Sequence, residues 1–415
     1  MGSSDLVVPF RGERYRATDR LSALIAPPYD VISPEQRGRY AAWDSHNIVH
    51  VMLPEAMAHE DRYARAAALL AAWRARGVLV TDAEPSVCVL AQEYQPPDGP
   101  ARTRLGVFAA VAAEPYEAGR VKPHEKTHAG PKADRLALLR ATRTNLESIF
   151  LIAPDADGAL AAELVGIAKT APTARAELDG VRVRVWVVGG EVASRIAHLA
   201  SRSPLYIADG HHRYETAVAY AQENPAGDRV LALLVSARDK GLTILPTHRM
   251  IFGPGRDPLT LLDRWARFFE VGSLPPRVDP VAGLAAIGAR GTACLMALPN
   301  GQHLTLVLKA NAPLDAVPGL PPSPAVRALD VAVFEELVVK EILLLDTSTP
   351  TLTYTPDARE ALLAVRKGAA TCAVLLNAPK VEQVFAVADA GEAMPQKSTY
   401  FIPKVPSGLV LRPLV

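Results

Sequence analysis

One turn near the middle of the chain constrains the fold most strongly. A short apolar segment, residues 205–207, leads into Asp209-Gly210-His211-His212-Arg213, and an apolar-periodic stretch, 214–222, follows it. This order predicts a strand, a tight turn and a helix. Because several other strand-like and helix-like segments flank this unit, we expect an α+β (mixed α/β) fold.

The same turn gathers groups that suit a phosphate. Gly210 allows the backbone to approach a ligand closely, and the positive end of the following helix favours an anion. His211, His212 and Arg213 add donors for phosphate oxygens. Asp209 has the chemistry to hold Mg²⁺ or to position a hydroxyl. The alternative is a polar helix start with Asp209 as the N-cap and solvated histidines, but the density of phosphate-compatible groups favours a binding site.

Composition narrows the class of protein. The 415 residues allow two or three domains, and the net charge of +1 provides no strong field toward nucleic acid or an acidic membrane surface. Cys88, Cys294 and Cys372 lack the spacing of a zinc site or a disulfide framework, which predicts buried structural thiols in a reducing compartment. Without a signal-peptide pattern or a membrane-length apolar run, we expect a cytoplasmic protein without nucleic-acid or membrane partners. A monomer and a homodimer are both compatible with the sequence.

The N-terminal part contains a proline-rich segment that presents Tyr29 and Asp30. This segment is either a rigid wall of a pocket or a surface turn. The pattern of residues 33–36 predicts a capping box at a helix start. Residues 46–54 resemble a strand that ends at a proline, and residues 60–76 resemble an amphipathic helix.

A second informative stretch surrounds Glu125. Basic neighbours, among them His124, would keep this carboxylate ionised at neutral pH, which suits a general base for a hydroxyl. A helix is predicted from residue 131 to 142, and Lys132 and Arg135 lie in its first turn, where a bound anion would offset their unfavourable position. The alternative is a solvated charged loop.

Two later stretches carry further polar groups. His248 and Arg249 interrupt an apolar strand-like segment and either face a pocket or begin a turn. Composition changes after residue 252, so we predict one domain over 1–252 and a second, α/β domain over 253–415. The last segment of the second domain resembles a binding loop, with its polar groups at Lys397, Ser398, Thr399 and Lys404.

Five motifs together resemble a widespread bacterial and archaeal family catalogued as a domain of unknown function. They are the segments 26–31, 124–135, 208–214, 246–249 and 395–404. The segment His124-Glu125-Lys126-Thr127, followed by the Asp-Gly-His-His-Arg turn, also resembles the ParB and sulfiredoxin superfamily, and within it the free serine kinases. About 80 residues separate the two segments here, whereas the kinases are more compact.

The resemblance to the kinases implies a ParB/sulfiredoxin-like nucleotide-binding core, a nucleotide such as ATP or ADP, Mg²⁺, and a small hydroxylated metabolite, with free L-serine as the first candidate. The implied catalytic residues are Glu125 as base, Asp209, which also binds the metal, and His211. The implied nucleotide and phosphate contacts are Gly210, His211, His212, Arg213, Thr127, Lys132 and Arg135. The implied substrate contacts are His124, Tyr29, Asp30, His248, Arg249, Lys397, Ser398, Thr399 and Lys404.

Three other functions compete with a metabolite kinase. A nucleotide-dependent switch of the ParB type is the main alternative, although the near-neutral charge and the lack of a basic tail disfavour binding to DNA. A sulfiredoxin-like repair enzyme would need a thiol beside the turn, and no cysteine lies within either motif. A transition-metal hydrolase built from the histidines, including His128, has no recognisable ligand spacing.

Overall fold

The computed structural model describes residues 5–56, 60–127, 129–252, 258–344 and 351–414. The chain forms two compact units. Unit 1 comprises Met1–Pro123, Thr127–Thr243 and Ile402–Val415, and unit 2 comprises His124–Lys126 and Ile244–Phe401. The sequence placed one boundary at 252/253, beside residues 253–257, which lie outside the described ranges. In the structure the boundary lies earlier, between Thr243 and Ile244, and the last residues of the chain, Ile402–Val415, belong to unit 1 again.

Unit 1 is built on a nine-stranded mixed sheet. In spatial order its main path is β6 (Val121–Lys122), β11 (Leu205–Asp209), β8 (Ile149–Ala153), β12 (Arg229–Ser236), β5 (Arg102–Ala112), β4 (Ser86–Tyr94), β10 (Val181–Gly189) and β9 (Ala174–Leu178). Strand β1 (Val7–Val8) pairs with β5, and two small sheets pair β2 (Glu13–Tyr15) with β3 (Leu79–Thr81) and β7 (Thr144–Asn145) with β21 (Arg412–Pro413). The central strands are apolar and buried on both faces, which explains their nearly continuous hydrophobic runs. Strands β4 and β5 pair antiparallel. This confirms what the sequence predicts, because two strand-like segments, 87–94 and 104–112, flank a turn rich in proline at 96–100.

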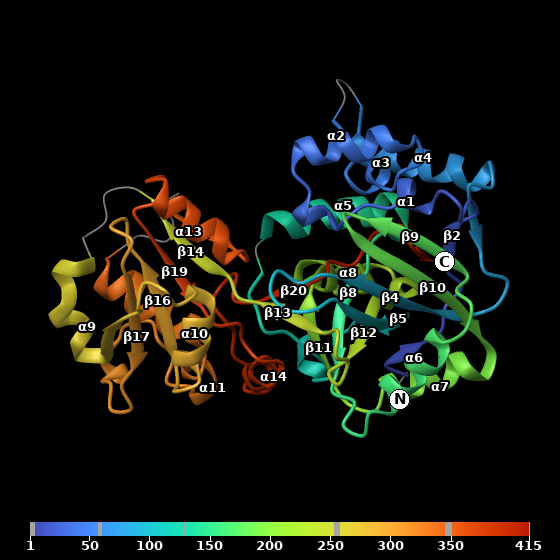
Figure 1. Ribbon diagram of the computed structural model, residues 1–415. Helices are drawn as coiled ribbons and strands as arrows, with labels where there is room; N and C mark the ends of the chain where they lie inside the picture. Colours follow the sequence, from blue (N-terminus) through green and yellow to red (C-terminus); the bar gives the residue numbers. More distant parts are fainter. Residues whose placement is uncertain (1–4, 57–59, 128, 253–257, 345–350, 415) are drawn as a thin grey trace. The chain divides into compact units, whose positions relative to one another are not determined.

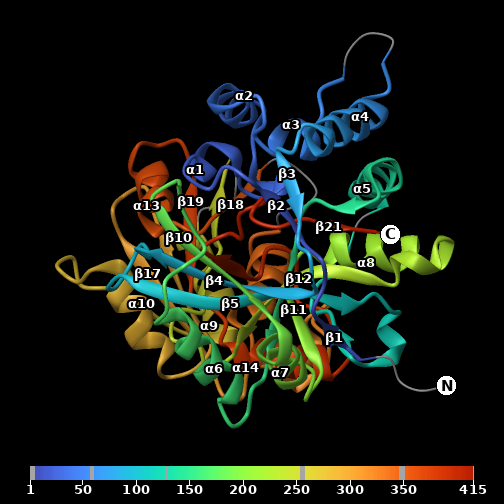
Figure 2. The same ribbon diagram turned by 90° about the vertical axis from the view of Figure 1, so that its right-hand side faces the viewer.

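Helices α6 (Ala159–Ala168) and α7 (Gly190–Ala200) cover one face of this sheet, as Figure 1 shows. Leu160 and Leu164 of α6 and Ile196 of α7 are buried against the strands. The remaining helices of unit 1 are α1 (Leu21–Leu24), α2 (Pro34–Trp43), α3 (Val49–Met52), α4 (Arg62–Ala75), α5 (Ala129–Thr142) and α8 (His211–Glu223). Helices α1 to α4 lie together in both views (Figures 1 and 2).

The helix starts show where local sequence determines structure. Ser33 and Gln36 form the predicted capping box at the start of α2. The prediction of a strand over residues 46–54 is wrong, because α3 forms there. The Asn47 side chain is fully buried, donates to two carbonyl groups of the preceding segment, and accepts the backbone N–H of Val49 at 3.0 Å. This amide begins a helical turn that apolar alternation did not reveal.

Unit 2 contains a six-stranded antiparallel sheet. Its spatial order is β15 (Phe269–Ser273), β17 (His303–Leu308), β16 (Ala293–Ala297), β19 (Cys372–Leu376), β14 (His248–Ile251) and β18 (Leu352–Thr355). Strand β13 (Thr243–Leu245) pairs with β20 (Tyr400–Ile402). The helices are α9 (Leu262–Phe268), α10 (Pro280–Gly288), α11 (Pro324–Arg327), α12 (Asp330–Val333), the π-helix η6 (Phe334–Ile342), α13 (Ala358–Arg366) and α14 (Val381–Asp389).

Two apolar cores lie on opposite faces of the unit 2 sheet. Helices α10 and α13 pack on one face through Leu284 and Ala361, and α9, η6 and α14 pack on the other through Trp265, Leu337 and Val384. The three cysteines are buried within strands of the two units, as predicted, and burial raises their pKa values. Within the described ranges, no helix is long and apolar enough to cross a membrane.

Candidate phosphate-binding site

The strand–turn–helix unit forms as predicted and places a carboxylate between two cations. Asp209 ends β11, and α8 begins two residues later at His211. One oxygen of Asp209, Oδ1, lies 2.6 Å from Nζ of Lys404, and the other, Oδ2, lies 2.5 Å from Nη2 of Arg213. Lys404 is 195 positions away in the sequence, so the fold brings the C-terminal segment of unit 1 to this turn.

The charges of this group determine how it titrates. Burial alone would raise the pKa of Asp209, but Lys404 and Arg213, followed by His211, hold that pKa well below its usual range. Asp209 is therefore a carboxylate throughout the physiological pH range. Burial lowers the pKa of Arg213, but nearby carboxylates, first Asp30 and Asp209, raise it more, so the guanidinium stays charged.

Gly210 gives the turn its shape. Its φ of +93° lies in the left-handed region, and it is the N-cap of α8. A Cβ at this position would lie 3.1 Å from Cζ of Arg213 and 3.2 Å from Cγ2 of Ile149, so a larger residue would be strained and crowded. The backbone of the first turn of α8 is thus presented at the positive end of the helix dipole, beside the two cations. His211 is buried and His212 is half-buried at this end.

A buried polar pair on the central sheet holds the segment that carries Lys404. Gln92 on β4 and Arg104 on β5 face each other across the strand pair, and Nη2 of Arg104 donates to Oε1 of Gln92. Gln92 donates from Nε2 to the carbonyl of Lys404 at 2.9 Å, and Arg104 donates from Nη1 to the carbonyl of Ile402 at 3.3 Å. The guanidinium of Arg104 also lies over the ring of Phe150, 4.6 Å from its centroid. Lys404 is thereby directed to Asp209 by its backbone as well as by its charge.

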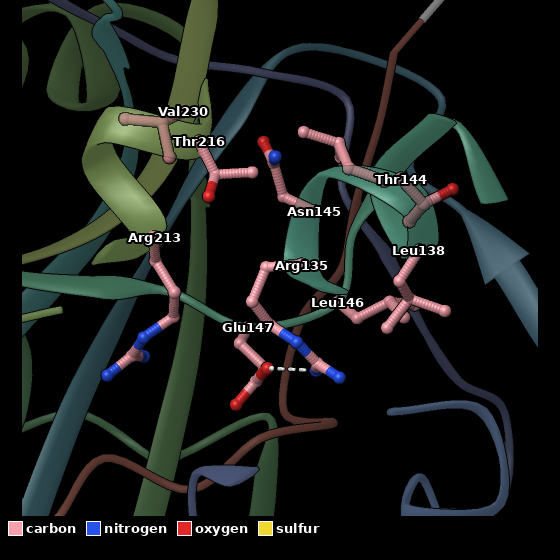
Figure 3. Close-up of a pocket in the computed structure, with 10 residues that line it drawn as sticks. Arg135, Leu138, Thr144, Asn145, Leu146, Glu147, Arg213, Thr216 and Val230 are labelled. Carbon is pink, nitrogen blue, oxygen red and sulfur yellow. Dashed lines mark ion pairs between the residues drawn. The ribbon is translucent and has the colours of Figure 1, made fainter. Parts of the chain in front are cut away.

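Arg213 also interacts with groups other than Asp209. Its Nη1 donates to the carbonyl of Ser148. Glu147 is buried and accepts the backbone N–H of Tyr29 at 2.9 Å, and its Oε2 lies 3.5 Å from Nη1 of Arg135. Burial raises the pKa of Glu147, although Arg213 and Arg135 oppose this shift. Figure 3 shows Arg213 from α8 and Arg135 from α5 on either side of Glu147.

Tyr29 and Arg135 belong to this set of groups. The guanidinium of Arg135 lies 4.3 Å from the ring centroid of Tyr29 and donates to the carbonyl of Met52. The cavity lined by Arg135, Glu147 and Arg213 has a volume of about 50 Å³, which is room for a few water molecules. It is too small for a nucleotide.

Two residues predicted to bind phosphate are engaged elsewhere. Thr127 donates from its hydroxyl to Oε2 of Glu215 at 2.7 Å, and Nζ of Lys132 lies 2.8 Å from the same oxygen. Both residues therefore stabilise the contact of their segment with α8, because Glu215 is the fifth residue of that helix. The predicted helix that includes Lys132 begins at Ala129, two residues before the expected start.

The predicted base belongs to unit 2. Glu125 forms an isolated parallel bridge with Met394, and the backbone N–H of Met394 donates to the carbonyl of His124 at 2.8 Å. His124 is buried, and its Nε2 lies 3.2 Å from Oγ1 of Thr399. The structure thus brings His124, Glu125 and Thr399 together within unit 2, whereas Asp209, Arg213 and Lys404 belong to unit 1.

Four further predicted substrate residues belong to unit 2: His248, Arg249, Lys397 and Ser398. Arg249 is fully buried, with its Nη2 3.5 Å from Oε2 of Glu335, and its Nη1 donates to both oxygens of Thr247. Thr247 in turn donates to the carbonyl of Lys397, whose side chain is exposed. The other two members of this set, His248 and Ser398, are buried. His248 and Arg249 are thus buried residues of strand β14, and the segment does not begin a turn at them.

The donor set does not fit a protein-held Mg²⁺. Both oxygens of Asp209 are already in ion pairs, with Lys404 and Arg213. Within the part of the chain that the structure describes, no three His, Cys, Asp or Glu side chains gather as metal ligands. We assign no step to a metal for this reason. His128, one of the histidines considered for a metal site, lies outside the described residues.

Three residues of the site did not emerge from sequence reasoning: Gln92, Arg104 and Glu147. Gln92 and Arg104 are polar residues in otherwise apolar strands, and that interruption was the available signal. Glu147 lies in the short segment before β8 and carries no pattern of its own.

Comparison with known proteins gives a family but no activity. No curated protein matches the sequence. Among solved structures, a conserved hypothetical protein from Pyrococcus furiosus is 15% identical, with 73% of this chain and 93% of that chain covered and a TM-score of 0.36. A free serine kinase in complex with AMP is 15% identical, covering 72% and 87% with a TM-score of 0.37. SbnI with a C-terminal truncation, from Staphylococcus aureus, is 12% identical, covering 74% and 87% with a TM-score of 0.39. These identities and TM-scores are too low to carry a functional argument.

A family model matches most of the chain. Residues 7–332 match the family described as "Protein of unknown function (DUF1015)". This range contains most of unit 1, including the turn at Asp209, and a large part of unit 2. It also covers four of the five motifs that pointed to such a family, and only the C-terminal one lies beyond it. The chain therefore belongs to the DUF1015 family.

Proposed function

We propose that unit 1 binds the phosphates of a nucleotide at the start of α8, and that the protein is a nucleotide-dependent phosphotransferase with a hydroxyl group as acceptor. The observation that carries the proposal is the convergence of Lys404 and Arg213 on Asp209 beside the first turn of α8. A helix start and two cations at one point form a typical anion site.

The residues of unit 1 supply charge and position in this proposal. Phosphoryl transfer needs mainly orientation of the phosphates and stabilisation of the charge on their oxygens. Lys404 and Arg213 are the cations that would contact those oxygens. Gly210 allows the ligand to approach the backbone of α8 without a side chain in the way. Asp209 keeps both cations in place before the nucleotide arrives.

The acceptor and the base are assigned from the sequence motifs. Their resemblance to the free serine kinases supports a ParB/sulfiredoxin-like core, ATP or ADP as donor, free L-serine as the first acceptor, and Glu125 as the base. Glu125 is half-buried on unit 2. A base of this kind takes the proton of the acceptor hydroxyl as that oxygen attacks the terminal phosphorus. The bond from this phosphorus to the bridging oxygen breaks, and the nucleotide leaves with one phosphate fewer. Mg²⁺, if the reaction needs it, would enter with the nucleotide phosphates.

Nucleotide binding is tested first. The full-length protein is titrated calorimetrically with ATP, ADP and CTP, with and without Mg²⁺, as wild type and as the variants Arg213→Gln and Lys404→Met. Arg140→Gln and Lys169→Met are matched controls, because Arg140 pairs with Glu223 on the surface and Lys169 is exposed. We expect at least one nucleotide to bind and both site variants to weaken it about tenfold or more. The absence of binding, or equal effects of site and control variants, would refute the site.

Transfer is tested separately by following ³¹P resonances during incubation with the bound nucleotide and a panel of hydroxy metabolites that begins with L-serine. We expect a phosphate monoester to form, and Glu125→Gln to abolish its formation while nucleotide binding persists. Nucleotide binding without transfer to any acceptor would favour the alternative function, a nucleotide-dependent switch of the ParB type. A gel shift with DNA over a range of salt concentrations would then test that alternative directly.

A further inference from the structure

A second cavity, of about 600 Å³, lies inside unit 2. It opens where β19 ends, between the C-terminal end of α10, the start of α12 and the connection from β19 to α14. Its volume falls within the range of roughly 300–1,000 Å³ that is usual for small-molecule sites. It belongs to unit 2, whereas the cluster around Asp209 belongs to unit 1.

The lining of this cavity includes the carboxylate of Asp330. Asp330 accepts a hydrogen bond from Nδ2 of Asn377 at 2.9 Å and another from the backbone N–H of Ala293. Across the described ranges, no ion pair joins Asp330 to a basic side chain. Burial raises the pKa of Asp330 to about 6, because the charged form of a carboxylate is unfavourable when it is removed from water and no cation compensates it. A ligand with an ammonium group would supply that charge.

Groups of the opposite sign line the same cavity. Lys380 is exposed at its rim, and α14 begins at the next residue. The start of a helix carries a partial positive charge, so this part of the lining favours an anion. Asp330 and Lys380 do not form an ion pair with each other. The cavity therefore presents a negative group and a positive group for two different parts of one ligand.

The walls are already fixed in position. Gln383 donates from Nε2 to the carbonyl of Ala328 at 2.7 Å and accepts the backbone N–H of Lys380 at 2.8 Å, so it ties two sides of the rim together. Gly288 closes a third side, where a Cβ would lie 2.5 Å from Nδ2 of Asn377 and displace that amide from Asp330. Because these hydrogen bonds already order the lining, a ligand would not lose free energy in ordering it, which favours binding.

We propose that this cavity binds a small zwitterion of the α-amino-acid class. Its ammonium group contacts Asp330, and its carboxylate lies toward Lys380 and the start of α14. Ala285 and Ala289 on the α10 side leave space for a side chain of modest size. The proposal does not depend on the activity proposed for unit 1.

The test is a calorimetric titration of the full-length protein with each of the twenty standard L-amino acids. For every amino acid that binds, the matched amine without the carboxylate and the matched 2-hydroxy acid are titrated as well; for L-alanine these are ethylamine and L-lactate. We expect at least one amino acid to bind and both of its analogues to bind about tenfold or more weakly. If no amino acid binds, or if the hydroxy acid binds equally well, the proposal is wrong.

Variants locate the site. Asp330→Asn keeps the shape and removes the charge, and we expect it to weaken binding about tenfold or more. Asp315→Asn is the matched control, because the Asp315 side chain is 91% exposed. Ala289→Phe adds a large side chain at another residue of the lining, so it tests the site even if Asp330→Asn unfolds. Arg140→Gln, on the surface of unit 1, should leave amino-acid binding unchanged. Wild-type affinity in Asp330→Asn or Ala289→Phe, or loss of affinity in Arg140→Gln, would overturn the assignment.

Discussion

Replacement of Gln92 by leucine tests whether the sheet directs Lys404 to the site. Gln92 is 1% exposed and joins three parts of unit 1. It accepts from Arg104 on the neighbouring strand and donates to the carbonyl of Lys404 at 2.9 Å. Leucine has a similar volume, so the substitution removes the two hydrogen bonds and leaves the packing of β4 nearly unchanged.

The expected cost follows from the two lost bonds. A neutral hydrogen bond contributes about 1 kcal/mol, and one to a charged group about 1.5–3 kcal/mol. The guanidinium of Arg104 is buried and loses an acceptor, so the larger value applies to that bond. We expect the free energy of unfolding of unit 1 to fall by about 3 kcal/mol. The segment that carries Lys404 should also loosen, so nucleotide affinity should fall together with stability.

Urea unfolding followed by tryptophan fluorescence measures the first effect, because Trp43, Trp73 and Trp186 belong to unit 1 and Trp265 alone belongs to unit 2. Calorimetric titration with the nucleotide measures the second effect. Gln222→Leu is the matched control, since Gln222 is exposed on α8 and its replacement should change stability by less than about 0.5 kcal/mol. A Gln92→Leu variant as stable as this control would show that the hydrogen bonds contribute nothing. Lost stability with unchanged affinity would show that Lys404 is positioned by Asp209 alone.

Three further substitutions test other parts of the argument. Gly210→Ala should lower the free energy of unfolding by about 1–3 kcal/mol, measured in urea, because φ is +93° and the space is crowded. Asn47→Ala removes three buried hydrogen bonds at the start of α3 and should cost about 3 kcal/mol, measured by the same method. For His248, burial lowers the pKa to about 4. Because the unfolded state then binds the proton more tightly, stability should fall by about 3 kcal/mol as the pH drops from 6.5 to 4. His248→Asn, which retains an acceptor for the N–H of Leu376, should flatten this dependence.

Local patterns predicted the parts of the fold whose structure depends on neighbouring residues. The β11–Gly210–α8 unit, the β4–β5 pair and the capping box of α2 formed as expected, because each is specified by adjacent residues. Residues 46–54 departed from the prediction because one buried amide, Asn47, overrides the apolar alternation. A single side chain that bonds to carbonyl groups more than twenty positions away leaves no periodic signal.

The candidate site was predictable only in part. The turn and the C-terminal loop were both identified from their composition, and the pairing of Asp209 with Lys404 joins them. The sequence could not show that Gln92 and Arg104 hold this loop by hydrogen bonds, because the two residues lie opposite each other only in the observed register of β4 and β5. It also could not show that Thr127 and Lys132 contact Glu215, since a threonine hydroxyl and a lysine ammonium group donate to a phosphate and to a carboxylate equally well.

Arg213 and Lys404, the two cations of the turn, differ in burial, and this difference predicts different roles. Asp30 and Asp209 both raise the pKa of Arg213, so the charge of this guanidinium is already balanced, and its side chain is only 9% exposed. The side chain of Lys404 pairs with Asp209 and is 19% exposed. Of the two cations, Lys404 is therefore the more accessible. An incoming phosphate should therefore contact Lys404 first, while Arg213 mainly holds Asp209. Arg213→Gln should reduce stability more than Lys404→Met does, because breaking a buried pair costs about 3–5 kcal/mol. Lys404→Met should reduce nucleotide affinity more. The reverse order in both measurements would show that Arg213 is the phosphate ligand and Lys404 the support.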